Sequence, residues 1–597
     1  MKIVSFLETF FWTAIIGFLF YNQYKYSSGI YTDVETYMQA VRAKFFVTSG
    51  TWLEQPFVLS NYPEGEILSV THLWDFIWVL CGLPFVHIPD MVMKMYYSGM
   101  FNSAMSVFFM LLFFVFGTKY TLPMITRNIA IILVILQKQI YSDFMLGHVN
   151  STLWVIVFTI FVWINLWNFS ENNDRTHNLF FVSLGCALLN WLAPEGVILS
   201  SILFLGLFIS WLLNKISIEY VSSCAFFFAL LVSLFFIINP PAQGYQEILL
   251  SRLSLWHVEI AWIFYVVFRI VRMFGIKKFV YRFLVFMIVM PSLLFAIYFT
   301  AGSGNLMFLP MSPYDTLTAI FGERFIIIKQ LYYPALIYPI LATFLGICLL
   351  FSSKFGSMSV VTLLWVMVSA VASYMNEKYY ALAAIVSVLM LVIVLEFFYT
   401  KRQKVTPIFA LLTGLFICVE FAILKYFPLK VAVDTPDKVH MSVIKDVVEL
   451  YNYRSGTVLS DVFTGPLILW YTSHNVVATP NFSNRKGILD ANKIWKTENP
   501  KECFNLLDKH KVDYVFLPER YDEKYFEKPN ENINKLYGQV ITGKNLPKWL
   551  KPMNDNQKVK YRLYKVQRDK TEEMLKMFEP KAEQEPVEVN TIFLPDF

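Results

Sequence analysis

Apolar runs of about the length needed to cross a bilayer recur along most of this chain. A membrane-spanning helix needs roughly 20 mostly apolar residues. An apolar N-terminal segment at 3–21 is followed by further such runs at 91–116, 128–145, 151–168, 178–193, 195–213, 217–239, 256–274, 279–299, 331–351, 357–375, 379–400 and 406–427. Of the 597 residues, 56% are hydrophobic and 16% are charged, and the mean hydropathy is +0.50. We therefore predict an α-helical polytopic membrane protein with about 13 transmembrane helices.

The positive charges predict which side of the membrane each loop occupies. They concentrate in alternate loops, most densely at Arg269–Arg282 and Lys401–Lys404. Cytoplasmic loops carry such an excess of Lys and Arg, which places the N-terminus inside. No small-residue cleavage site follows the segment 3–21, so we expect an uncleaved anchor. The apolar stretch Ile67–Val86 is broken by Gly82 and Pro84, and we do not count it as a span.

The composition changes after about residue 428, where charged residues become frequent and apolar runs shorten. Short strands are predicted at Val458–Ser460, Asn475–Ala478 and Val512–Leu517, and helices at Val443–Tyr453 and Lys501–Lys511. Alternating helices and strands indicate a soluble α/β domain. We expect a transmembrane domain at 1–427 with outer loops at 23–90, 141–150 and 300–330. A periplasmic α/β domain at 428–567 and a loose tail at 568–597 follow.

Acidic and polar residues gather in the predicted outer loops. Asp33 and Glu35 follow the first apolar segment directly. Carboxylates beside a bilayer are costly unless they serve a function, although ordinary solvated acids remain the simpler reading. A carboxylate here can bind a divalent cation or act as a general base. Further outer-face candidates are His72, Asp75, His148, Asn150, Glu195, Glu323 and Lys378.

Each of these further candidates also has a purely structural interpretation. Asn150 can cap the helix that follows it, and Pro194 and Gly196 explain a turn beside Glu195 without any function. Lys378 at a span boundary is typical of a lysine that extends its ammonium group to the interface. None of them identifies a site alone.

Taken together, the motifs resemble the catalytic-subunit family of oligosaccharyltransferases within the GT-C class of glycosyltransferases. The order of elements matches along nearly the whole chain, and a bacterial branch of the family is most similar. The resemblance rests on Tyr31–Tyr37, Asn61–Gly65, Gly147–Thr152, Trp191–Glu195 and Lys378–Tyr380. It implies a GT-C fold with a C-terminal outer domain.

The resemblance also implies roles for individual residues. The first-loop acid of the family activates the acceptor and binds a divalent metal, which gives Asp33 that role with Mg²⁺ or Mn²⁺. Asn150 stands where the family has an acidic ligand, and Glu323 is the candidate for a later-loop acid. Lys378 replaces an arginine that contacts the donor pyrophosphate, so a charge remains but bidentate geometry is lost.

The family's Trp-Trp-Asp acceptor motif is absent from this chain. Its nearest counterpart is Ser460–Gly465. Glycosylation of protein asparagine at a sequon is therefore not predicted.

The first hypothesis is a glycosyltransferase of the bacterial inner membrane that acts on the periplasmic side. It would use a polyprenyl-linked sugar donor within the membrane lipid, and the sequence does not identify the acceptor. A catalytically inactive relative that binds lipid-linked glycans is the alternative, motivated by Asn150. A lipid or solute transporter ranks third because no related halves are visible. No basic stripe indicates nucleic acid, and the six cysteines show neither metal-ligand spacing nor a disulfide framework.

Overall fold

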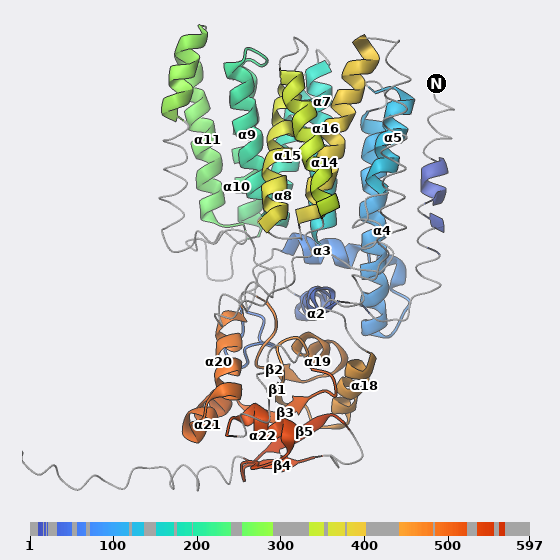
Figure 1. Ribbon diagram of the computed structural model, residues 1–597, viewed down its shortest axis with the longest axis vertical. Helices are drawn as coiled ribbons and strands as arrows, with labels where there is room; N and C mark the ends of the chain where they lie inside the picture. Colours follow the sequence, from blue (N-terminus) through green and yellow to red (C-terminus); the bar gives the residue numbers. More distant parts are fainter. Residues whose placement is uncertain are drawn as a thin grey trace, which may run out of the picture. The chain divides into compact units, whose positions relative to one another are not determined.

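Figure 1 shows the computed structural model of the chain. The residues that it describes are 10–15, 17–18, 21, 31, 33–50, 56–66, 72–118, 122–135, 151–171, 176–193, 195–239, 253–276, 278–289, 333–350, 356–375, 379–401, 441–481, 484–521, 534–553 and 560–567. The chain forms two compact units. The first contains residues 1–57, 66–439 and 480–483, and the second contains residues 58–65, 440–479 and 484–597.

The first unit is helical. Most of its helices run side by side, while a short helix, α3, lies across them (Figure 1). The helices are α2 (Val34–Ser49), α3 (His72–Leu80), η1 (Leu83–Phe85), α4 (Met91–Gly117), α5 (Met124–Ile135), α7 (Ser151–Glu171), α8 (Thr176–Leu192), α9 (Glu195–Leu212), α10 (Ile218–Ile238), α11 (Leu255–Met273), α14 (Tyr333–Leu350), α15 (Ser357–Met375) and α16 (Tyr380–Lys401).

Three helices in the described part of the chain are long and apolar enough to cross a membrane. They are α4, the Ser151–Phe169 portion of α7, and α10. Shorter apolar helices occur at other predicted positions, including Ser357–Ser373 and Ala381–Phe397. The helical class is confirmed, whereas the count of about 13 spans stays a prediction. Helix α3 has nine residues, which at 1.5 Å per residue is too short to span a bilayer.

Helices α9 and α15 illustrate how the bundle is held together. A side chain at Gly206 would place its Cβ 2.8 Å from Val361, so the missing side chain lets the two helices approach closely. The indole of Trp365 donates a hydrogen bond to the carbonyl of Leu199 at 2.9 Å. Small residues and interhelical hydrogen bonds substitute here for the hydrophobic effect, which is weak between helices in lipid.

The second unit is an α/β domain with a five-stranded sheet in the order β2-β1-β3-β5-β4. Strands β1, β2 and β3 are parallel, and β5 pairs antiparallel with both β3 and β4. Its elements are α18 (Met441–Glu449), η4 (Leu450–Asn452), β1 (Thr457–Leu459), α19 (Gly465–Tyr471), β2 (Asn475–Val476), α20 (Arg485–Lys496), α21 (Pro500–Lys509), β3 (Val512–Leu517), α22 (Leu536–Thr542), β4 (Leu550–Pro552) and β5 (Arg562–Val566).

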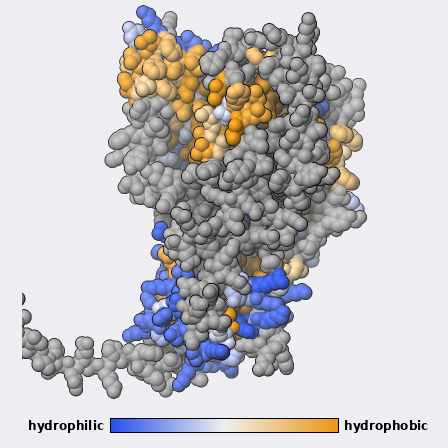
Figure 2. Space-filling view, viewed as in Figure 1, coloured by the Kyte–Doolittle hydropathy of each residue, from blue (hydrophilic) through white to orange (hydrophobic). Residues whose placement is uncertain are grey.

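The predicted C-terminal strands fall on β1, β2 and β3, and the two predicted helices fall on α18 with η4 and on α21. Strands β4 and β5 were not predicted. The membership of residues 58–65 in this unit was not predicted either, because those residues lie almost 400 positions earlier in the chain. Hydrophilic residues cover much of this unit in Figure 2, and hydrophobic residues gather over the helical unit.

The sheet core gives a direct test of the second unit. Leu517 in β3 is fully buried, whereas Leu489 in α20 is 40% exposed. We expect Leu517→Ala to destabilise the unit by about 2–5 kcal/mol through lost burial and a cavity, and Leu489→Ala by less than about 1 kcal/mol. Hydrogen exchange of β3 amides in the full-length protein measures this. Equal effects of the two variants would contradict the assignment of β3 to the core.

Candidate functional site

Asp33, the central predicted acid, lies at the N-terminus of α2 as its N-cap. Its Oδ1 accepts a hydrogen bond from the backbone N–H of Thr36 at 2.7 Å, and its Oδ2 accepts one from the Thr36 hydroxyl at 2.7 Å. The side chain is half-buried. The partial positive charge of a helix N-terminus favours a carboxylate there. Asp33 is thus held in one orientation while part of its surface stays accessible.

Tyr31 fixes the chain just before Asp33. Its ring is 1% exposed, and its hydroxyl donates a hydrogen bond to the carbonyl of Met95 in α4 at 3.1 Å. Gly99, one turn further along α4, has no side chain to obstruct this contact. A Cβ at Gly99 would lie 2.7 Å from the Tyr31 hydroxyl and 2.6 Å from Trp78. The start of α2 is therefore held against α4 by packing that depends on a glycine.

Glu35, the predicted helper of Asp33, lies in the first turn of α2 and is exposed. Its Oε1 accepts a hydrogen bond from the Gln39 amide at 3.4 Å, one turn along the helix. An acid in a first helical turn is stabilising on electrostatic grounds alone.

Asp75, another predicted site residue, forms a buried ion pair. The guanidinium Nη2 of Arg42 in α2 lies 3.0 Å from Oδ2 and 3.2 Å from Oδ1 of Asp75 in α3. Their side chains are 4% and 2% exposed. A buried pair of this kind fixes geometry strongly, because removing either partner leaves an uncompensated charge. Asp75 therefore joins α2 to α3, and Arg42 was not singled out from the sequence.

Glu66 is a third buried charged residue of this region, and it also escaped the sequence analysis. Its backbone pairs with that of Phe57 in an isolated antiparallel bridge, with N–O distances of 2.8 and 3.1 Å. Burial raises the pKa of the Glu66 carboxyl to about 8, although Arg42 and Asn481 act in the opposite direction. In the sequence, the signal for Glu66 is its position directly after Tyr62–Gly65, whereas its backbone pairing with Phe57 is seen only in the structure.

The remaining predicted residues fall into two groups. His72 begins α3 and Glu195 begins α9. His148, Asn150, Glu323 and Lys378 lie outside the described residues. Within the described part, no group of three or more His, Cys, Asp or Glu side chains could hold a metal ion. The convergence of Asp33, Asn150 and Glu323 on one metal therefore stays a prediction.

The segment nearest to an acceptor motif, Ser460–Gly465, forms the turn between β1 and α19. Asp461 is 1% exposed, and its Oδ1 accepts hydrogen bonds from the backbone N–H groups of Phe463 and Thr464, both at 3.1 Å. The Thr464 hydroxyl donates to its Oδ2. This acid is used to shape a buried turn, as acids before helices commonly are.

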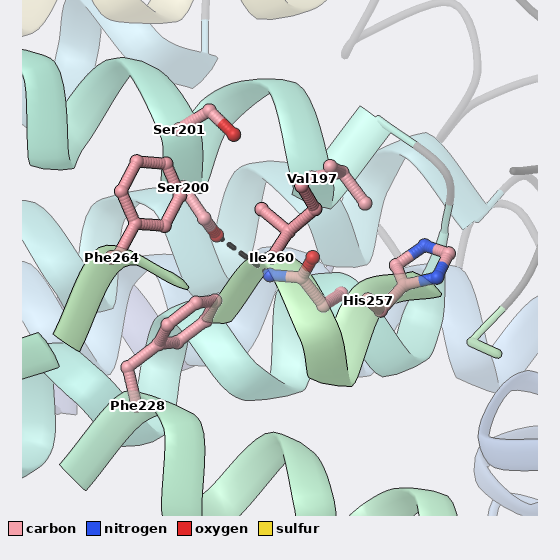
Figure 3. Close-up of a pocket in the computed structure, with 8 residues that line it drawn as sticks. Val197, Ser200, Ser201, Phe228, His257, Ile260 and Phe264 are labelled. Atoms are coloured by element: carbon pink, nitrogen blue, oxygen red, sulfur yellow. Dashed lines mark hydrogen bonds between the residues drawn. The ribbon is translucent and has the colours of Figure 1, made fainter. Parts of the chain in front are cut away.

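A small cavity lined by both polar and apolar side chains lies in the helical unit among α8, α9, α10 and α11 (Figure 3). Its volume is about 10 Å³, which is close to the minimum for one water molecule and far too small for a sugar. His257 lies on one side and the rings of Phe228 and Phe264 lie on the other. Asn190 donates a hydrogen bond to Ser200 at 2.8 Å. None of the predicted catalytic residues lines this cavity.

Solved structures identify the fold. No protein-family model matches the sequence, and no curated protein sequence matches it. The oligosaccharyltransferase AglB from Archaeoglobus fulgidus, in complex with an inhibitory peptide and a dolichol-phosphate, superposes with a TM-score of 0.63 at 13% identity. That match covers 85% of this chain and 69% of the archaeal chain. The Archaeoglobus fulgidus oligosaccharyltransferase in complex with Zn and sulfate gives a TM-score of 0.59 at 14% identity, covering 82% of this chain and 64% of the other.

The resemblance predicted from the motifs is thus confirmed at the level of the fold. This chain has the oligosaccharyltransferase-like GT-C fold. At such low identity the similarity establishes the arrangement of the chain, and residue roles have to be argued from this chain's own side chains.

The Arg42–Asp75 pair predicts how Asp75 variants behave. We expect Asp75→Ala to destabilise the helical unit by about 3–5 kcal/mol, because it leaves the Arg42 guanidinium buried without its partner. The double variant Arg42→Met with Asp75→Leu should recover most of that loss. Thermal unfolding of the purified protein in detergent measures both. A single variant as stable as the wild type would show that the pair does not join α2 to α3.

Glu66 predicts a dependence of stability on pH. Its folded-state pKa of about 8 lies above the ordinary value of 4.5. Between these values the carboxyl is protonated in the folded protein and ionised in the unfolded chain, so stability falls as the pH rises through this range. We expect Glu66→Gln to raise the melting temperature above about pH 8 and to change it little near about pH 4.5. Glu64→Gln, at a side chain that is 45% exposed, is the control and should keep the wild-type profile.

Proposed function

We propose that this chain is a membrane glycosyltransferase. It moves a sugar or oligosaccharide from a polyprenyl-phosphate-type lipid donor to a glycan, lipid or surface acceptor. The GT-C fold supports the general class, and the archaeal chain of the same fold was solved with a dolichol-phosphate. The observation that carries the proposal is Asp33, an oriented and half-buried carboxylate at the N-terminus of α2.

In this proposal Asp33 acts on the acceptor. Thr36 holds the carboxylate through two hydrogen bonds of 2.7 Å, and the α2 N-terminus stabilises its negative charge. The side chain is half-buried, so part of its surface can meet an acceptor hydroxyl. Asp33 orients that hydroxyl and accepts its proton as the sugar is transferred. Lys378 supplies a point charge for the donor phosphate.

The predicted metal ligands fit a divalent cation in part. Asp33, Asn150 and Glu323 would offer oxygen ligands, which Mg²⁺ and Mn²⁺ prefer. When bound, such an ion would stabilise the negative charge of the departing phosphate. The similar archaeal oligosaccharyltransferase was solved in complex with Zn and sulfate. We place the reaction on the periplasmic side of a bacterial inner membrane, following the charge distribution of the loops.

The experiment compares two aspartates that cap helices. Asp90 caps α4 by accepting a hydrogen bond from the Val92 N–H at 2.8 Å. Asparagine caps helices about as well as aspartate, so Asp33→Asn and Asp90→Asn both preserve their helices and each remove one charge. We expect Asp33→Asn to reduce transfer of a labelled polyprenyl-phosphate sugar by about 100-fold or more. Asp90→Asn should retain normal transfer.

The assay uses membranes supplied with Mg²⁺ or Mn²⁺, and runs polyprenyl-phosphate and polyprenyl-diphosphate donors separately. Full activity of Asp33→Asn would overturn the assignment of Asp33. Wild-type protein that binds both donors but does not transfer the sugar from either of them would favour the inactive, glycan-binding alternative.

A further inference from the structure

A hairpin of the helical unit, here called the α11 hairpin, is formed by the end of α11 and the helix Phe279–Val289 that follows it. The chain turns after α11 at Gly275, whose φ is 55° and whose N–H donates a hydrogen bond to the Arg272 carbonyl at 3.1 Å. Glycine adopts this left-handed backbone without strain, so the chain can reverse here within a few residues.

One side of the α11 hairpin is packed against α9. The Phe208 ring of α9 lies 5.4 Å from that of Phe268 in the first arm and 5.5 Å from that of Phe286 in the second arm, measured between ring centroids. The Arg282 guanidinium lies 5.2 Å from the centroid of the Trp211 ring, and its Nη1 donates a hydrogen bond to the Trp211 carbonyl at 2.8 Å. Both arms are therefore fixed to α9, and Arg282 is used for this attachment.

Many other side chains of the α11 hairpin are apolar and exposed. Exposed fractions from 44% to 77% are found at Ile270, Met273, Phe274, Phe279, Val280 and Phe283. Hydrophobic residues gather at the upper left of Figure 2, where Figure 1 shows α11, and hydrophilic residues lie at the tip above them. An apolar surface of this kind marks a contact with a membrane or a partner. The hairpin thus has one packed side and one side that is available to an apolar molecule.

Three cationic side chains lie in the same hairpin. Arg269 and Arg272 are neighbours on the surface of α11, and Lys278 directly precedes the second arm. Arg269 and Lys278 are exposed, and Arg272 is half-buried. Within the described residues, no carboxylate lies within ion-pair distance of any of the three. Glu219, in the first turn of the neighbouring helix α10, is exposed, and three cations against this one acid leave the region positively charged.

The combination of charge and apolar surface decides which kind of partner fits the hairpin. Lys and Arg beside a membrane helix are expected from their effect on topology, and so are apolar residues within it. A soluble anion would satisfy the cations but leave the apolar surface uncovered. A lipid without net charge would cover the apolar surface but leave the cations without a counter-charge. A lipid with an anionic headgroup satisfies both.

We propose that the α11 hairpin is a binding surface for an anionic phospholipid. The phosphate of the headgroup binds to Arg269, Arg272 and Lys278, and the acyl chains cover the exposed apolar side chains of the hairpin. Guanidinium groups bind phosphate through paired hydrogen bonds, and an ammonium group adds a point charge. Arg282 holds the hairpin in place and is not a ligand. This binding is independent of the proposed glycosyl transfer.

The test titrates the full-length protein in detergent with phosphatidylglycerol and counts the bound lipids by native mass spectrometry. The wild type is compared with the triple variant Arg269→Gln, Arg272→Gln and Lys278→Gln. We expect the apparent affinity of this variant for phosphatidylglycerol to be lower by about tenfold or more, because three charges are lost. Phosphatidylcholine, whose headgroup has no net charge, should bind equally to both proteins.

A second triple variant is the control for the loss of charge. Arg485→Gln, Lys486→Gln and Lys501→Gln remove the same charge from exposed positions of the C-terminal unit. This variant should bind phosphatidylglycerol as the wild type does. If it loses as much affinity as the hairpin variant, the effect comes from the overall charge of the protein and the proposal is wrong.

Two further measurements complete the test. Lys278→Gln alone changes one exposed side chain, so it remains informative if the triple variant does not fold, and we expect it to weaken phosphatidylglycerol binding by about threefold or more. Glycerol phosphate at the concentration of the lipid should not displace phosphatidylglycerol, because it has no acyl chains. Unchanged affinity in the hairpin variants, or displacement by glycerol phosphate, would overturn the proposal.

Discussion

A buried ion pair between Arg42 and Asp75 is the interaction on which the candidate site depends. It joins α2 to α3 at a place that water does not reach, with a closest approach of 3.0 Å. Helix α2 carries Asp33 at its N-terminus, and α3 contacts both α2 and α4. Because a broken buried pair is far more costly than an exposed one, the orientation of α2 has few alternatives. An acid that must meet a substrate benefits from such a rigid support.

The same region shows how structural and catalytic acids can be told apart. Asp33 is half-buried and Glu35 is exposed, whereas Asp75 and Glu66 are almost fully enclosed. Asp75 is matched to a guanidinium, and burial raises the pKa of Glu66 to about 8. Only an accessible acid can contact a substrate. The two enclosed acids, Asp75 and Glu66, therefore support the framework, and Asp33 remains the candidate catalytic acid. Asp75 is paired with Arg42 in this framework, and its place in a functional site stays a prediction.

Buried polar groups likewise define the C-terminal unit. Ser60, Asn484 and His510 bring an early part of the chain to the edge of a late sheet. An apolar contact would tolerate small shifts of residues 58–65, but directional hydrogen bonds at 2.7–2.8 Å do not. Asp461 is a local example, because its carboxylate accepts hydrogen bonds from backbone N–H groups of the turn that precedes α19.

The helical membrane class and the strands β1, β2 and β3 could be predicted because each depends on a local run of residues, long and apolar or short and strand-forming. Asp33 stood out because it follows the first apolar segment, and its role as the N-cap of α2 was seen only in the structure. The contacts of Arg42 with Asp75, 33 positions apart, and of Tyr62 with His510, 448 positions apart, became visible only in the folded chain. Such partners leave no periodic trace in a single sequence, because hydrogen bonds and ion pairs depend on distance in space. For the same reason, the strands β4 and β5 appeared only once the antiparallel pairing of β5 with β3 and of β4 with β5 was seen.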